Sequence, residues 1–193
     1  GKSGIPQVAK KAIDTAAKMY DIPPCVLHGI MKAESGGGRP VGIFGQSLFR
    51  DTPSIAAANK ANSGAFGVGQ VLMSTYLATA ANFALRVAHW EIGDPIKYGY
   101  KSVAHVIVGK VVSRGSLKRG LNSYAGDSSG LKGGARKLKA VMGKCSGKYS
   151  YDKLNSIMSS KKVRRKYYEN IIDGAIALKG QPEKAFIKAA EKA

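Results

Sequence analysis

The spacing of apolar residues is the feature that most constrains this fold. In several segments apolar side chains recur at intervals of three and four residues, which places them on one face of a helix. The first such segment contains Ile5, Val8, Ala9, Ala12, Ile13, Ala16 and Ala17. The second follows "DIPP", whose prolines suit the first turn of a helix, and it carries Val26, Leu27, Ile30 and Met31. The spacing predicts a mainly helical protein.

Helical patterns continue through the rest of the chain, with one interruption. Further helices are expected from Ser74 to about Ala88, from "GDP" at 93–95 to about Val112, and near residues 116–125, 131–142, 151–158 and 160–179. Residues 36–73 are rich in glycine and small polar residues. They predict irregular structure with a short hairpin.

The length of 193 residues is enough for one domain with its own core. We expect a single domain over residues 1–180 and a helical tail over 181–193 that packs on it or extends from it. "GKCSGKYS" at 143–150 is the best candidate for a loop or a weak boundary. No apolar run approaches the roughly 20 residues of a membrane span. With no signal-peptide pattern and no initiator Met, we expect a mature product or an excised domain.

The charge of the chain is strongly positive and uneven. Lysine and arginine total 31 against 12 acids, and 22 of these basic residues lie in residues 97–193, with "KKVRRK" at 161–166 as the densest run. Such a field attracts polyanions, either nucleic acid or the anionic polymers of a bacterial wall. The tyrosines are scattered and no nucleic-acid-binding motif is present, which argues against nucleic acid.

Two cysteines, Cys25 and Cys145, are present. Neither lies in a C-x-x-C or histidine-rich setting, so neither a metal nor another cofactor is expected. One disulfide and two buried free thiols are both consistent with the sequence.

Glu34 stands out because it lies on the apolar face of the second helix. It follows Met31 by three residues and Ile30 by four, so the three side chains share a face. Partial burial and the negative end of the helix dipole both disfavour a charged carboxylate there, which predicts a raised pKa. A carboxyl group that stays protonated near neutral pH is what a general acid requires. The glycines that follow, at 36–38, end the helix and leave room for a ligand.

Two later stretches contain further candidate residues. In "NSGAFGVGQ", residues 62–70, three glycines open the backbone to a ligand and Gln70 offers an amide to a polar substrate. A phosphate-binding loop is disfavoured because no "GK[ST]" follows. In "LNSYAGDSSG", residues 121–130, Tyr124 is expected at a helix end. There it would hydrogen-bond a sugar, position Glu34 or pack in the core.

Taken in order, "MKAESGG", "SGAFGVGQ" and "LNSYAG" resemble the successive motifs of the soluble lytic transglycosylases and their goose-type lysozyme relatives. The resemblance spans roughly residues 8–175. It implies a lysozyme-like α+β fold, mainly α, with two helical lobes, a substrate groove and a small irregular or hairpin region. It implies Glu34 as the catalytic acid. The substrate-binding residues that it implies are Ser35, Ser63, Gly64, Gln70, Tyr124 and Gly126.

The resemblance implies cleavage of peptidoglycan between N-acetylmuramic acid and N-acetylglucosamine. A single carboxyl group suffices if the substrate's own N-acetyl and C6 hydroxyl groups take part, and the product is then a 1,6-anhydro sugar. The alternative is hydrolysis by a goose-type mechanism, which needs a second carboxylate. Asp51 is the best candidate for it and Asp127 is the other, although a loop-capping role is the more ordinary one for both.

A third class remains open, a non-catalytic basic module that binds the cell wall or nucleic acid. On the enzymatic hypothesis the partners are peptidoglycan strands and, through the basic C-terminal half, anionic wall polymers. We expect a monomer that acts at the bacterial cell wall. Strong basicity and a compact domain favour a bacteriophage lysin or virion enzyme over a bacterial remodelling enzyme.

Overall fold

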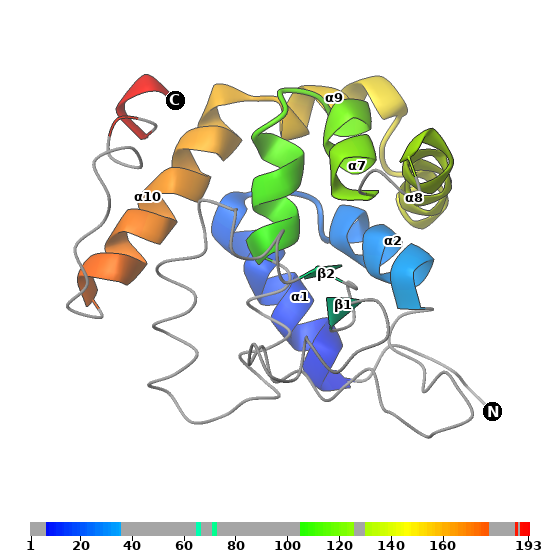
Figure 1. Cartoon of the computed structure of the whole chain (residues 1–193), viewed down its shortest axis with the longest axis horizontal. Coiled ribbons are helices and arrows are strands. Elements are labelled where there is room, and N and C mark those ends of the chain that lie inside the picture. Colours follow the sequence, from blue (N-terminus) through cyan, green and yellow to red (C-terminus); the bar gives the residue numbers. More distant parts are fainter. Residues whose placement is uncertain are drawn as a thin grey trace.

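The computed structural model describes residues 7–35, 65–66, 71–72, 105–125, 130–177, 188 and 190–193 (Figure 1). Its labelled helices are α1 (Gln7–Tyr20), α2 (Pro24–Ser35), α7 (Leu117–Ala125), α8 (Gly130–Lys144), α9 (Tyr151–Met158) and α10 (Lys161–Ala177). Residues 105–112 are helical as well. The prediction of a mainly helical protein is confirmed for these residues.

Most expected elements lie close to their predicted bounds. The helical pattern that ends at Val112 is present over residues 105–112, and residues 188 and 190–192 of the tail are helical. The hairpin expected within 36–73 includes strands β1 (Ala65–Phe66) and β2 (Val71–Leu72), which pair antiparallel. The helix expected after Ser74 lies outside the described residues. Among the described residues, no helix has the length and apolarity needed to cross a bilayer.

The helices assemble around a shared core. Helix α8 packs against both α2 and α7, while α1 packs against α2 and α10 (Figure 1). The apolar face predicted for α2 is buried, with Val26, Ile30 and Met31 each 0% exposed. Other members of the cluster are Ile13, Ala16, Ala17, Val106, Ile107, Val108, Leu121, Val141, Leu154 and Val163.

Residues 105–112 form a helix although they are rich in β-branched side chains, which have poor helix propensity. Burial explains this outcome, since Val106, Ile107 and Val108 are each 0% exposed and point to successive directions around the helix axis. A helix that is apolar on every side is typical of a buried core element. Packing therefore outweighs the few tenths of a kcal/mol per residue that propensity costs.

The crossing of α2 and α8 is fixed at three points along the two helices. Cys25 and Cys145 form a disulfide, which decides between the two states that the sequence left open. One turn further along α2, a Cβ atom added to Gly29 would lie 2.5 Å from Cα of Val141. The backbones touch there, and only glycine permits this approach. Further along α2, the Glu34 carboxylate forms an ion pair with Lys137 of α8.

The loop expected at 143–150 begins where α8 ends, at Lys144. Gly147 has φ of +77°, a conformation that favours glycine. Ser150 then caps α9, where its side-chain oxygen accepts a hydrogen bond of 3.2 Å from the backbone N–H of Lys153. The loop is confirmed, and Cys145 within it ties it to α2.

We expect Gly29→Ala to lower the free energy of unfolding by about 1–3 kcal/mol, because the added methyl group forces the α2 and α8 backbones apart. Gly143→Ala is the matched control. A Cβ atom at Gly143 has nothing within 4 Å, so this substitution should be neutral or stabilise the protein by up to about 1 kcal/mol. Urea denaturation measures both values. Equal effects of the two substitutions would contradict the close contact.

Candidate functional site

Glu34 lies in the last turn of α2, which ends at Ser35. The residues one turn earlier, Ile30 and Met31, are fully buried, and the Glu34 side chain is itself only 11% exposed. The apolar face therefore carries the carboxyl group into the protein, as the spacing predicted. This position follows from helix geometry, since residues three and four apart share one face.

Two cations from α8 lie beside the Glu34 carboxyl group. Oε1 is 2.7 Å from Nζ of Lys137, whose side chain is 3% exposed. The same oxygen is 3.8 Å from Nη2 of Arg136, whose side chain is 62% exposed. The short contact is an ion pair that lacks the directional geometry of a hydrogen bond. The carboxyl group therefore has a buried cation and an exposed cation as neighbours.

These cations are the functional neighbours that sequence reasoning missed. The sequence predicts an acid among apolar side chains, whereas the structure adds an ammonium group 2.7 Å from the carboxyl oxygen. A signal for it exists in the sequence. Lys137 is spaced four residues before Val141 and eight before Cys145, so it lies on the buried face of α8. A lysine in such an apolar row requires a partner, because an unpaired buried charge is costly.

The arrangement around Glu34 has a chemical use as well as a structural role. It holds one carboxyl group in a partly buried position beside an ammonium group and a guanidinium group. A carboxyl group that is fixed in this way can take part in proton transfer to a ligand bound beside it.

Residues 121–125 of the third motif, "LNSYAG", lie in α7, and α7 packs against α8, as α2 does. A Cβ atom at Gly134 of α8 would collide with the side-chain oxygen of Asn122, so α7 and α8 also approach closely. Tyr124 lies in the last turn of α7, as expected for a helix end. Its side chain is outside the described part of the structure. The first and third motifs thus belong to two helices that share α8 as a neighbour.

The remaining predicted site residues are placed only in part. Ser35 is the last residue of α2, and its side chain is not among those described. Gln70 directly precedes β2 in the sequence. Ser63, Gly64, Gln70 and Gly126 lie outside the described residues, as do the two candidate second carboxylates, Asp51 and Asp127. Their roles stay predictions.

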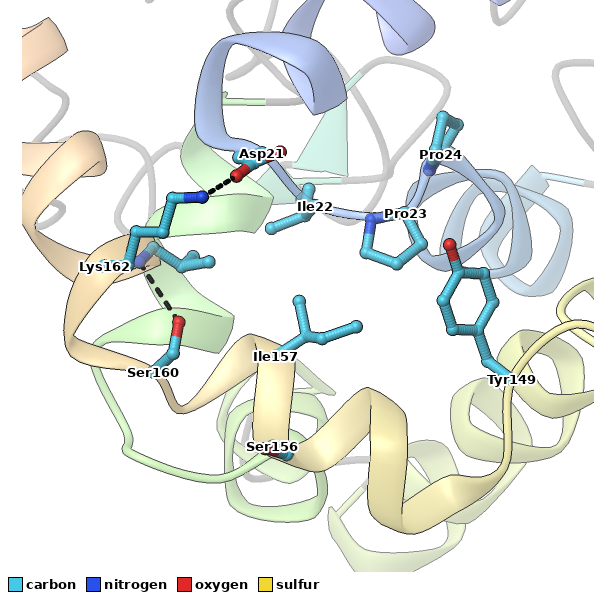
Figure 2. Close-up of a pocket in the computed structure, with 10 residues that line it drawn as sticks. Asp21, Ile22, Pro23, Pro24, Tyr149, Ser156, Ile157, Ser160 and Lys162 are labelled. Atoms are coloured by element: carbon cyan, nitrogen blue, oxygen red, sulfur yellow. Dashed lines mark hydrogen bonds and ion pairs between the residues drawn. The ribbon is translucent and has the colours of Figure 1, made fainter.

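A pocket of about 490 Å³ lies near the opposite end of α2 (Figure 2). Ile157 points from α9 toward Ile22 and Pro23, and the Tyr149 ring borders the same space. At one side, Nζ of Lys162 is 2.6 Å from Oδ2 of Asp21. The pocket is roughly 15 Å along α2 from Glu34, and none of the predicted site residues lines it.

A cluster of polar aromatic side chains is buried where α1 meets α10 and residues 105–112. The Tyr20 hydroxyl group and Nδ1 of His105 share a hydrogen bond, and their rings meet edge to face. The ring of Tyr167 lies 5.6 Å from that of Tyr20. Burial, and secondarily the proximity of Tyr167, raises the pKa of Tyr20 well above its ordinary value. These groups join α1, α10 and residues 105–112, which is a structural role.

His28 and Asp14 form a second pair that the sequence did not reveal. Nε2 of His28 is 2.6 Å from Oδ1 of Asp14, and the two side chains are 14% and 42% exposed. The contact joins α2 to α1. It adds to the fixation of α2, the helix that carries Glu34.

The chain was compared with known proteins at three levels. No protein-family model, no curated protein sequence and no solved structure matches it. The case for a function therefore depends on the residues and their geometry.

We expect Lys137→Met to lower the free energy of unfolding by about 3–5 kcal/mol, since it leaves the Glu34 carboxylate buried without its closest cation. Glu34→Gln alone should also destabilise. The double substitution should lower the free energy of unfolding by clearly less than the sum of the two single effects. In this double-mutant cycle the difference measures the coupling between the two side chains. Lys139→Met, at an exposed position of α8, is the control and should change stability by no more than about 0.5 kcal/mol. Additive single effects would contradict the pair.

A second prediction concerns alkaline pH. Since the pKa of Tyr20 is raised in the folded state, its contribution to stability is fully present below the ordinary tyrosine value and is lost as pH rises toward the folded value. We expect the free energy of unfolding to fall above about pH 10. Tyr20→Phe should be less stable at neutral pH and show a shallower decline. Denaturation at several pH values compares the slopes, and equal slopes would contradict this assignment.

Proposed function

We propose that this protein cleaves bacterial peptidoglycan between N-acetylmuramic acid and N-acetylglucosamine, as a lytic transglycosylase with Glu34 as its only catalytic carboxyl group. The proposal includes a lysozyme-like arrangement of two lobes around a groove, with Ser35, Gln70 and Tyr124 among the substrate contacts. It also includes action at the cell wall as a monomeric bacteriophage enzyme.

One observation carries the proposal: the Glu34 carboxyl group is 11% exposed in the last turn of α2 and has a proton-bearing partner at 2.7 Å. This is the residue that the resemblance assigns as the acid. General acid catalysis requires a carboxyl group that is held in place and partly desolvated. The disulfide and the Gly29 contact fix the helix that carries it.

The proposed reaction moves two protons through Glu34, and the protein ends with as many protons as it had at the start. Lys137 gives the first proton to the Glu34 carboxylate when the glycan excludes water from the site. Glu34 then protonates the glycosidic oxygen, and the bond from C1 to that oxygen breaks. The substrate's N-acetyl oxygen stabilises C1 from the other face.

In the second half of the reaction the Glu34 carboxylate takes the proton of the C6 hydroxyl group as that oxygen bonds to C1. The products are a 1,6-anhydromuramic end and a free N-acetylglucosamine hydroxyl group, formed without water. The proton from the C6 hydroxyl group then passes from Glu34 to Lys137, which restores the starting state of the protein. Hydrolysis is the rival outcome, with Asp51 as the second carboxylate that holds a water molecule.

A non-catalytic binding module is the second candidate function. The observation that favours it is the same ion pair, because a carboxylate held by a buried lysine and an exposed arginine is also a common structural arrangement. The positive charge of +19 would then serve to bind the cell wall or nucleic acid.

We expect Glu34→Gln to lower the rate of lysis of purified cell walls by at least about two orders of magnitude, the scale of a general acid. Glu169→Gln, the same chemical change at an exposed position of α10, is the matched control and should keep full activity. Circular dichroism must show that both variants are folded. Mass spectrometry of the released fragments should find 1,6-anhydro ends.

The outcomes separate the candidates. Fragments with reducing ends that carry an added water would show that the enzyme is a hydrolase and not a transglycosylase. Full activity of Glu34→Gln would remove Glu34 from the mechanism. A folded wild-type protein that binds walls without releasing fragments would favour the non-catalytic module.

A further inference from the structure

Two arginines from different helices converge on one turn of the chain. The turn at 113–116 joins the helical residues 105–112 to α7 at the upper end of the helices in Figure 1. A Cβ atom added to Gly115 would lie 3.5 Å from Nη2 of Arg164 and 3.8 Å from Nη2 of Arg119. Gly115 itself has φ of +68°, a conformation that favours glycine. The turn thus has two guanidinium groups beside a residue without a side chain.

The surroundings of these arginines are cationic. The sequence contains no acid between residues 105 and 125, and none between 161 and 168. The ion pairs among the described residues include neither arginine. Two like charges brought together without a carboxylate are unfavourable by themselves. They become favourable when an anion lies between them.

The polar contacts of the two side chains also favour an anion at this turn. Nε of Arg119 donates a hydrogen bond of 3.3 Å to the Ser116 hydroxyl group, which orients that guanidinium over the turn. Nε of Arg164 is buried and has no acceptor among the described residues. A buried guanidinium N–H without an acceptor is rare in proteins, and a bound ion is one of its ordinary explanations.

The helix ends add to the same field. Arg119 lies in the first turn of α7 and Arg164 in the first turn of α10, and neither first turn contains an acid. The N-terminus of a helix carries partial positive charge, so cations there are unfavourable and anions are favourable. An anion between the two arginines would therefore interact with two guanidinium groups close to the N-terminus of α7.

We propose that Arg119 and Arg164 form a binding site for one phosphate group of a phosphodiester polymer. A tetrahedral oxyanion can accept hydrogen bonds from guanidinium groups on two sides, whereas a carboxylate pairs best with a single arginine in its plane. If the wall function proposed above holds, the polymer is a poly(alditol phosphate) of the cell wall. Only this choice of polymer depends on that function; the phosphate site does not.

The test measures binding of fluorescent poly(glycerol phosphate) by anisotropy at about 0.15 M salt, where long-range attraction is screened beyond about 8 Å. The variant with Arg119→Gln and Arg164→Gln should bind at least about tenfold more weakly, because it loses two charge-assisted contacts. The matched control carries Lys118→Gln and Arg165→Gln. It makes the same change of charge at exposed neighbouring positions and should lose no more than about threefold.

Further variants and probes test which chemistry of the ligand the site recognises. The pair Arg119→Lys and Arg164→Lys keeps the charge but removes the two-pronged donors, and it should recover only a small part of the affinity. Polyglutamate of equal charge should bind more weakly than poly(glycerol phosphate). Glu34→Gln should bind as the wild-type protein does, since the probe contains no glycan bond to cleave. Loss of catalysis and loss of this site are therefore observed separately.

Several results would overturn the proposal. An equal loss of affinity in the control variant, or full recovery with lysine, would show that binding depends on overall charge alone. Polyglutamate that binds as tightly would exclude phosphate recognition. Single-stranded DNA that binds through the two arginines while poly(glycerol phosphate) does not would replace the wall polymer by nucleic acid.

Discussion

The contact between α2 and α8 is the constraint on which the rest depends. A disulfide holds one end of it, a glycine lets the two backbones touch in the middle, and a buried ion pair forms the other end. The contacting residues are four or five apart on α2. On the other side, Lys137 and Val141 are four apart on α8, and Cys145 follows four residues later, directly after the helix. Residues at these spacings lie along one face. Any side chain larger than hydrogen at Gly29 would separate the helices and move Lys137 away from Glu34.

The distribution of charge follows from how each cation is held. Lys137 is buried, and its burial is tolerated because a carboxylate lies at 2.7 Å. Arg119 and Arg164 are held instead at the edge of the protein, by a serine hydroxyl group and by packing around the turn at 113–116. The first arrangement neutralises charge inside the protein, whereas the second concentrates it outward. One chain thus contains both a closed ionic pair and an open cationic surface.

Periodicity in the sequence was sufficient to predict the helices and the buried face of α2, including the inward position of Glu34. These features depend on residues only three or four apart, so local spacing carries the information. The Glu34–Lys137 pair and the convergence of Arg119 with Arg164 were not predicted, because each joins residues from helices far apart in the chain. No alternation or motif encodes such a pairing. The β-branched residues 106–108 are helical, as their spacing predicted, because burial decided their conformation against their propensity.

The disulfide bears on where the protein acts. Closing a loop with a sequence separation of 120 residues restricts the unfolded chain enough to contribute about 4–5 kcal/mol to stability. That contribution persists only under oxidising conditions, which prevail outside the cytosol. The disulfide is therefore consistent with the proposal that the protein acts at the cell wall. In a reducing environment the bond between Cys25 and Cys145 would be lost, and the position of Glu34 would then depend on the non-covalent contacts of α2, among them those of Gly29 and Lys137.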